Sequence, residues 1–222
     1  MKNWIKRNRG YLIFLLCFGL FRTAIADWNP RGSGSMRPNL LEGDVVFVNR
    51  LAYDVKLPLT DIIVAHVADP KRGDIVTFSS PKDGTRLIKR IVALPGDQVE
   101  MRDEVIFVNG EAAAYDEPEV LLEPIEPQGY IKAMRLTETV GQHQRRIQLL
   151  AGVAARNSFG PVTVPRDSFL ALGDNRDNSA DSRYFGFVPR HLLIGQANHV
   201  LVSADIKGNW LPRPDRFGQR LQ

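Results

Sequence analysis

Two serines near the start of the chain lie in a context that suits either a flexible linker or a nucleophile. They are Ser33 and Ser35 in GSGSMRP, residues 32–38, which comes shortly after a long apolar segment. Composition alone favours a Gly/Ser linker that leaves a membrane anchor. A serine hydroxyl becomes a good nucleophile at neutral pH only beside a group that takes its proton. The choice between the two interpretations therefore depends on whether the chain supplies a base.

Histidine is the usual base for serine, and none of the four histidines of this chain stands out. They are His66, His143, His191 and His199. They lie far apart and match neither HExxH nor HxxxH, so a histidine-based metal site is not expected either. A lysine can serve instead if it is neutral, and burial in apolar surroundings lowers the pKa of an amine. The base to look for is therefore a lysine within an apolar strand.

Lys89 lies in such a strand, within RLIKRIVAL, residues 86–94. The alternation of a strand places its side chain on the same face as Leu87, Ile91 and Ala93. The amine then has apolar neighbours on its own side, which suits a neutral lysine. The same spacing also fits an edge strand whose lysine reaches water, and spacing alone leaves this alternative open.

A third stretch, LGDNRDNSADSRYFGFVP at residues 172–189, concentrates charges, amides and hydroxyls. A calcium loop is one interpretation, but Arg176 and Ser179 interrupt the D-x-[DN]-x-[DN]-G pattern, and Phe185 stands where glutamate is required. A plain polar, turn-rich loop is another. We favour a structural loop that holds a site through hydroxyls and ion pairs, as functional loops do.

The elements that must position these residues are mostly short strands. Segments rich in β-branched and aromatic residues are bounded by Gly, Pro and Asp at 44–50, 73–79, 86–94, 104–110, 169–173 and 199–205. Asn109-Gly110 is a strong signal for a two-residue hairpin. Residues 111–160 show little hydrophobic alternation and predict a more variable sub-domain or excursion. The sequence after residue 205 has the composition of a loose tail.

The N-terminus has the features of a membrane anchor. Residues 1–10 carry basic residues and no acidic one, and an apolar stretch follows. This stretch has about 16 residues if Arg22 is bridged, against roughly 20 for a full span. The positive-inside rule places residues 1–10 in the cytoplasm and the rest of the chain outside it. The alternative is a signal peptide cleaved after Ala26, because residues 24–26 form an A-x-A pattern.

Composition further limits the number of domains, the kinds of site and the partners that this chain can have. The chain has 222 residues, of which 44% are hydrophobic, so it can bury the core of one domain or two small ones. Its single cysteine, Cys17, excludes an intrachain disulfide and a Cys-rich zinc site. The net charge of +4 comes without a dense basic block in the body of the chain, which disfavours nucleic acid as a partner.

Together these stretches resemble the bacterial signal peptidase I (leader peptidase) family, serine peptidases with a Ser–Lys dyad. The family's boxes are matched in order and spacing by SGSMRPNLLEGD (33–44), RGDIVTF (72–78), IKRIVALPGD (88–97) and GDNRDNSADSRYFGFVP (173–189). The run GDNRDNSADSR is the most specific of these matches. The resemblance extends from residue 22 to about residue 203.

The resemblance implies a role for individual residues. Ser35 matches the nucleophile and Lys89 the general base. Ser33 matches a residue whose hydroxyl completes an oxyanion hole with the backbone N–H of Ser35. Ser179 matches the hydroxyl that orients the lysine amine. Supporting polar and ionic contacts are matched by Asp174, Asp181, Arg183 and Arg90.

The resemblance also implies a mainly β fold, with two antiparallel β-sheet domains preceded by one N-terminal transmembrane helix. The expected parts are a cytoplasmic tail (1–10), the anchor (11–27), a catalytic domain (28–97 and 164–205), an inserted smaller second domain (98–163) and a C-terminal tail (206–222). The expected location is the inner (plasma) membrane, single-pass, with the catalytic domain on the periplasmic or extracytoplasmic side.

The implied activity is cleavage of signal peptides from exported preproteins after small residues at −3 and −1. The implied partners are those signal peptides and the bilayer near the export translocon, without a cofactor, a metal or nucleic acid. Arg31-Gly32 departs from the apolar residue and proline of many members. This departure leaves open a dedicated conjugation or pilin peptidase of the same clan. An inactive membrane-tethered β binding domain would lack Ser35 or Lys89, and both are present.

Overall fold

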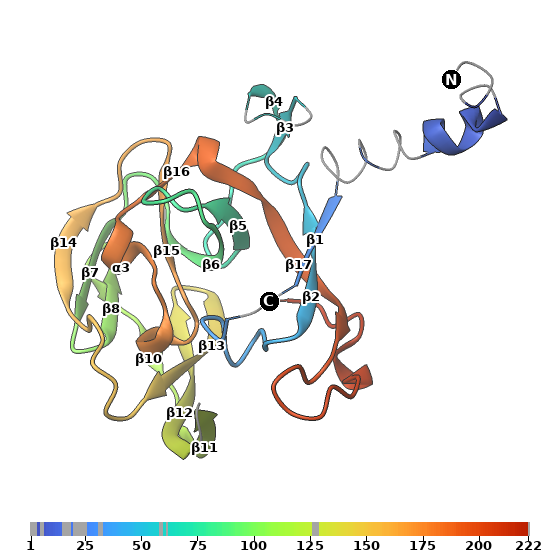
Figure 1. Cartoon of the computed structure of the whole chain (residues 1–222). Coiled ribbons are helices and arrows are strands. Elements are labelled where there is room, and N and C mark those ends of the chain that lie inside the picture. Colours follow the sequence, from blue (N-terminus) through green and yellow to red (C-terminus); the bar gives the residue numbers. More distant parts are fainter. Residues whose placement is uncertain are drawn as a thin grey trace.

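The computed structural model places most of the chain in antiparallel β-sheets (Figure 1). The structure describes residues 4, 7–14, 19, 26–30, 33–57, 60, 62–125 and 129–221. Among these residues the helices after the first strand are short: η1 (Arg176–Asn178), α3 (Ser182–Phe185), η2 (Arg190–Leu192) and η3 (Pro214–Arg216). The mainly β class predicted from the short alternating segments is confirmed.

The largest sheet has seven strands in the order β1-β2-β17-β5-β6-β15-β16. Their bounds are β1 (Ala26–Pro30), β2 (Asp44–Asn49), β17 (Leu193–Ser203), β5 (Ile75–Ser79), β6 (Arg86–Ala93), β15 (Ser168–Leu172) and β16 (Val188–Pro189). Every pairing in this sheet is antiparallel. The order brings β6 and β15 side by side, although 74 residues of chain separate the end of β6 from the start of β15.

Strand β6 is buried on both faces from residue 88 to residue 93. On one face Ile88 packs in a cluster with Met36 and Val46. On the other face Ile91 packs in a cluster with Phe78. Apolar burial of this kind stabilises the fold by about 25 cal/mol for each Å² removed from water, so β6 is held in place from both sides of the sheet.

The insertion between β6 and β15 forms two smaller sheets. One has the order β14-β7-β8-β9, with bounds β7 (Gln98–Arg102), β8 (Val105–Val108), β9 (Glu111–Ala112) and β14 (Phe159–Thr163). The other pairs β12 (Gly129–Val140) with β10 (Ala114–Tyr115), β11 (Glu119–Ile125) and β13 (His143–Leu150). A further hairpin, β3 (Asp54–Lys56) and β4 (Ile63–His66), projects at the top of Figure 1.

Residues 111–160 contain long strands, in a stretch whose composition predicts a more variable sub-domain or excursion and which the family resemblance places in an inserted second domain. Strand β12 alone runs over 12 residues. One face carries the buried Leu136 and Val140, but also the fully buried Glu138 between them. Because this charged residue interrupts the apolar positions of the buried face, the sequence lacks the regular alternation that predicts a strand. The predicted hairpin at Asn109-Gly110 is present between β8 and β9, with φ of 54° and 84°.

The C-terminal residues are attached to the main sheet rather than loose. Arg216 of η3 donates to both carboxylate oxygens of the buried Asp44, at 3.1 and 2.6 Å. Isolated bridges pair His199 with Arg220, and Leu221 packs against the core. A composition rich in Pro, Gly and Arg does not reveal such an attachment, because the partner carboxylate lies 172 residues away.

The anchor predicted for residues 11–27 lies in large part outside the described residues, as does the alanine motif of the alternative cleavage site apart from Ala26. In the part of the chain that the structure describes, no helix has the length and apolar character needed to cross a membrane.

Candidate active site

Ser35 and Lys89 meet inside the protein. The Nζ of Lys89 donates a hydrogen bond of 2.7 Å to the Oγ of Ser35, across 54 residues of sequence. Both residues are buried, with 7% and 2% of their surface exposed. A short, directed contact between a hydroxyl and an amine is the geometry that transfers a proton between them.

The two residues come from differently built elements. Ser35 lies in a turn ahead of β2, in which the N–H of Arg37 donates to the carbonyl of Gly34 at 3.1 Å. Lys89 lies on β6, which pairs with β5 on one side and β15 on the other. The alternative of an exposed edge strand for Lys89 is therefore wrong, because this strand is central to the sheet.

Ser33 lies beside the pair, with its Oγ 3.3 Å from the Oγ of Ser35. Either hydroxyl can be the donor in this contact. Ser33 is exposed while Ser35 is buried. The hydroxyl of Ser33 is therefore close enough to act on a group that is bound at Ser35 and still accessible from outside.

Ser179 packs against Gly173, whose α-carbon also lies close to the backbone of the turn that carries Ser35. A Cβ at Gly173 would lie 2.2 Å from the Oγ of Ser179 and 2.6 Å from the carbonyl oxygen of Ser35. Only glycine fits this close approach. The Oγ of Ser179 is buried and has no hydrogen-bond partner among the described residues, so the bond to Lys89 that the family resemblance implies is not formed here.

Asn175 holds the nucleophile turn, a role that the sequence did not reveal. Its backbone N–H donates to the carbonyl of Ser35 at 3.1 Å, and its Nδ2 donates to the carbonyl of Gly34 at 3.0 Å. Asn175 is almost fully buried. Two hydrogen bonds from one residue thus join the loop of residues 173–183 to the turn that carries Ser35.

Arg90 and Asp174 form a bidentate ion pair at 2.8 and 2.7 Å. Both are buried, and Arg90 also donates to the carbonyl of Gly73 at 2.9 Å. Paired guanidinium–carboxylate bonds of this kind are strong and fix orientation. Since Arg90 follows Lys89 on β6, the pair ties the strand of the lysine to the loop of residues 173–183.

Asp181 and Arg183 stabilise the other end of that loop. Arg183 donates to the two carboxylate oxygens of Asp181 at 2.8 Å each. Asp181 also accepts from the N–H of Gly173 at 3.0 Å and caps α3 by accepting from the N–H of Arg183. Asp181 thus links Gly173, at the start of the loop, to Arg183 at its end.

A second buried cluster, centred on Glu138 of β12, binds the same loop through Arg176. The sequence did not reveal this cluster. Arg176 donates to the carboxylate of Glu138 at 2.8 and 2.6 Å, Arg145 at 2.5 Å and the hydroxyl of Tyr115 at 2.8 Å. Burial alone would raise the pKa of Glu138, but the two guanidinium groups lower it to about 2. Burial, with the charge of Glu138, raises the pKa of Tyr115 to about 12.

Comparison with known proteins links the chain to one family. The family described as signal peptidase, peptidase S26, matches residues 1–202. The signal peptidase I of Pseudomonas fluorescens is 37% identical over 199 residues, covering 84% of this chain and 68% of the relative. The one from Rickettsia massiliae is 32% identical over 219 residues, covering 90% and 81%.

A solved structure also matches. The crystal structure of a signal peptidase I from Enterococcus faecalis V583 is 31% identical, with a TM-score of 0.35. The match covers 59% of this chain and 97% of that one.

Proposed function

The chain belongs to the signal peptidase family, peptidase S26, and we propose that it cleaves signal peptides from exported preproteins with Ser35 as nucleophile and Lys89 as general base. The observation that carries this proposal is the hydrogen bond of 2.7 Å between the two side chains. The family membership supplies the class of reaction, and the geometry of the pair supplies the two groups.

In the first half of the proposed reaction, neutral Lys89 takes the hydroxyl proton of Ser35. The Oγ of Ser35 then attacks the scissile carbonyl, and a tetrahedral intermediate forms. Collapse of this intermediate breaks the C–N bond, and the Lys89 ammonium returns the proton to the leaving amine of the mature protein. The signal peptide is left as an ester on Ser35.

In the second half, water replaces the leaving amine. Lys89 takes a proton from the water, which attacks the ester carbonyl, and the same proton returns to the Oγ of Ser35 as the ester breaks. One lysine thus does what histidine does in a Ser–His–Asp triad. Burial of its amine favours the neutral form that both steps require.

Charge on the intermediate is stabilised by the N–H of Ser35 and the hydroxyl of Ser33. Each such donor contributes on the order of 3–4 kcal/mol to transition-state stabilisation. The contact of 3.3 Å between the two serine hydroxyls supports this role for Ser33. Ser179, whose buried hydroxyl has no partner among the described residues, orients the amine of Lys89 once substrate is bound.

The proposed substrate is a preprotein whose signal peptide is still in the bilayer. Small side chains at −3 and −1 fit the shallow pockets of this family, and the stretch that precedes Ser33 is expected to shape them. An N-terminal anchor in residues 11–27, with the catalytic domain outside the cytoplasm and near the translocon, would bring Ser35 close to such a substrate.

Cleavage of a preprotein with Ala at −3 and −1 tests the proposal. We expect full-length wild type in detergent to cleave it, and Ser35→Ala and Lys89→Ala to be at least about 1,000-fold slower. Lys82→Ala, which removes an exposed loop lysine, is the control. The rate constant kcat/KM should rise with pH as Lys89 loses its proton. Near-full activity of Lys89→Ala would disprove the dyad.

The anchor is tested separately from the chemistry. We expect the protein to stay in the membrane fraction after high-salt washing and its intact mass to equal that of the encoded chain. A mature N-terminus at Asp27 would instead show that the first 26 residues are removed.

A further inference from the structure

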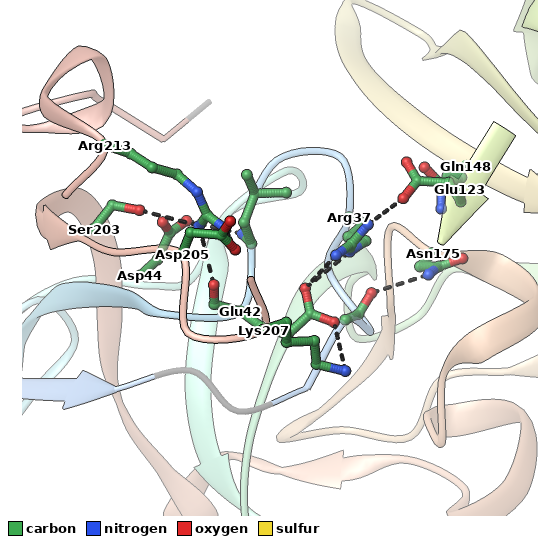
Figure 2. Close-up of polar contacts among 12 residues, drawn as sticks. Arg37, Glu42, Asp44, Glu123, Gln148, Asn175, Ser203, Asp205, Lys207 and Arg213 are labelled. Atoms are coloured by element: carbon green, nitrogen blue, oxygen red, sulfur yellow. Dashed lines mark hydrogen bonds and ion pairs between the residues drawn. The ribbon is translucent and has the colours of Figure 1, made fainter. Parts of the chain in front are cut away.

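A charged cleft of about 690 Å³ opens beside the nucleophile turn. Arg37 and Glu42, two and seven residues after Ser35 in the chain, line one side, and Glu123 of β11 lines another. Figure 2 shows Arg37 between these two carboxylates, with Lys207 of the C-terminal segment beside Glu42. The guanidinium group of Arg37 therefore links the turn that carries Ser35 to the inserted sheet across this cleft.

Arg37 makes bonds on both sides of this cleft. Its Nε donates to Glu42 at 2.9 Å and its Nη2 lies 2.8 Å from the same carboxylate. Its Nη1 donates to Glu123. The three side chains are only 18%, 8% and 7% exposed. Partly desolvated guanidinium–carboxylate bonds are stronger and better directed than exposed ones.

The Arg37–Glu42 pair occupies the space that a side chain at Gly34 would need. A Cβ at Gly34 would lie 2.8 Å from an oxygen of Glu42 and 3.4 Å from the Nε of Arg37. The carbonyl of Gly34 is meanwhile held by the Nδ2 of Asn175 at 3.0 Å and the N–H of Arg37 at 3.1 Å. Two hydrogen bonds therefore hold the carbonyl of Gly34, and the Arg37–Glu42 pair packs beside its α-carbon.

This arrangement determines where the N–H of Ser35 points. The peptide bond between Gly34 and Ser35 is planar, so its carbonyl and its N–H point in opposite directions. Fixing the carbonyl of Gly34 toward Asn175 thus fixes the N–H of Ser35 on the opposite side. We propose that Arg37, through Glu42 and Glu123, is a positioning residue that orients this peptide and its oxyanion donor.

The inference rests on the proposed function, because an oxyanion donor matters only if Ser35 is acylated. It also gives the inserted sheet a part in catalysis, since Glu123 lies 86 residues from Arg37 in sequence. Arginine suits this position better than lysine, because one planar guanidinium can bind two carboxylates in fixed geometry.

The test is steady-state cleavage by Arg37→Gln, with wild type and Ser35→Ala measured in the same assay. A slightly misplaced donor should lower kcat about tenfold and leave KM within about twofold. Arg37→Lys should fall between Arg37→Gln and wild type. The matched control is Arg146→Gln, which removes an exposed ion pair to Glu119 of the same strand β11 and should keep wild-type kcat.

Further readouts separate a positioning effect from general damage to the fold. A peptide aldehyde, which forms a tetrahedral adduct on Ser35, should bind Arg37→Gln about tenfold more weakly. An uncleavable peptide should bind it as tightly as wild type. The pH midpoint of kcat/KM should not move, because Lys89 is untouched. Melting curves check the fold, and if Arg37→Gln is unfolded at the assay temperature, the comparison is made with Arg37→Lys.

Each other result overturns the inference. Wild-type kcat in folded Arg37→Gln or, where that variant is unfolded, in Arg37→Lys would show that Arg37 does not position the donor. A rise in KM alone would make it a substrate-binding residue, and an equal loss in Arg146→Gln would make the effect non-specific. A shifted pH midpoint would place its action on Lys89. An inactive wild type would instead refute the proposed function, and this inference with it.

Discussion

The loop of residues 173–183 touches two groups of buried ionisable side chains that are built in different ways. On one side Asn175 holds the turn of Ser35, whose hydroxyl meets the amine of Lys89. On the other side Arg176 meets Glu138, which also binds Arg145 and Tyr115. One group joins an amine to a neutral hydroxyl, and the other surrounds a carboxylate with cations.

The difference shows how one fold places one pair of groups for proton transfer and keeps another group permanently charged. Two guanidinium groups stabilise the carboxylate of Glu138 so strongly that its pKa falls to about 2. Its charge is constant at any physiological pH, and its bonds hold the loop in place. The contact between Ser35 and Lys89 involves a group that can give a proton and a group that can take it. Such a pair is suited to chemistry only if its surroundings are rigid.

The largest effect is expected from Lys89→Met, which replaces the amine by an apolar group of similar length. Cleavage should fall by about 10⁴-fold, because no base is left for Ser35. The free energy of unfolding should change by less than about 1 kcal/mol, since a buried amine is costly and methionine fills the same space. Preprotein cleavage and urea denaturation measure the two quantities. A loss of several kcal/mol would make Lys89 a structural residue like Glu138.

Glu138→Gln should have the opposite profile, with its main effect on stability. The change leaves two guanidinium groups buried without their counter-charge, which costs about 3–5 kcal/mol. Urea denaturation measures the loss. Glu119→Gln is the control, because it removes an exposed partner of Arg146 on the neighbouring strand and should cost less than about 1 kcal/mol. Equal losses in the two variants would contradict the importance of burial.

Acid should weaken the Glu138 cluster in a defined range. The folded-state pKa of about 2 lies below the ordinary value of 4.5, so the contribution is complete above pH 4.5 and is lost as pH falls toward 2. The loss amounts to about 3 kcal/mol, since each unit of pKa shift corresponds to about 1.4 kcal/mol. Urea denaturation between pH 5 and 2.5 should show a steep decline for wild type and a shallower one for Glu138→Gln. Parallel declines would refute this assignment.

The Ser35–Lys89 pair is easier to predict from the sequence than the Glu138 cluster. Local patterns, a Gly/Ser turn and a lysine in an apolar strand, make Ser33, Ser35 and Lys89 candidates, and the short strands around them follow from local patterns as well. The family resemblance then distinguishes Ser35 from Ser33 and favours Lys89 as the base. Glu138 and Arg145 lie on strands whose alternation is broken by those same charges. Their pairing with Arg176, like that of Arg37 with Glu123, joins distant parts of the chain. Such contacts are set by tertiary packing rather than by spacing.

The smallest effects are expected from substitutions of two serines in the loop of residues 173–183. Their comparison separates an effect on kcat from an effect on stability. The Oγ of Ser179 has no hydrogen-bond partner among the described residues, so Ser179→Ala should change the free energy of unfolding by less than about 0.5 kcal/mol. If its hydroxyl orients Lys89 in the substrate complex, kcat should nevertheless fall about tenfold to a hundredfold. Catalytic hydrogen bonds often tighten only when substrate is bound.

Ser182→Ala is the matched comparison, because the hydroxyl of Ser182 accepts a hydrogen bond of 2.9 Å from the N–H of Ala171 in β15. Removing it leaves a buried N–H unsatisfied and should cost about 1–3 kcal/mol of stability, with kcat within about threefold of wild type. Cleavage kinetics and urea denaturation of both variants give the answer. Wild-type kcat in Ser179→Ala would show that Lys89 is oriented by other groups, and the unpartnered hydroxyl would then be a packing feature beside Gly173.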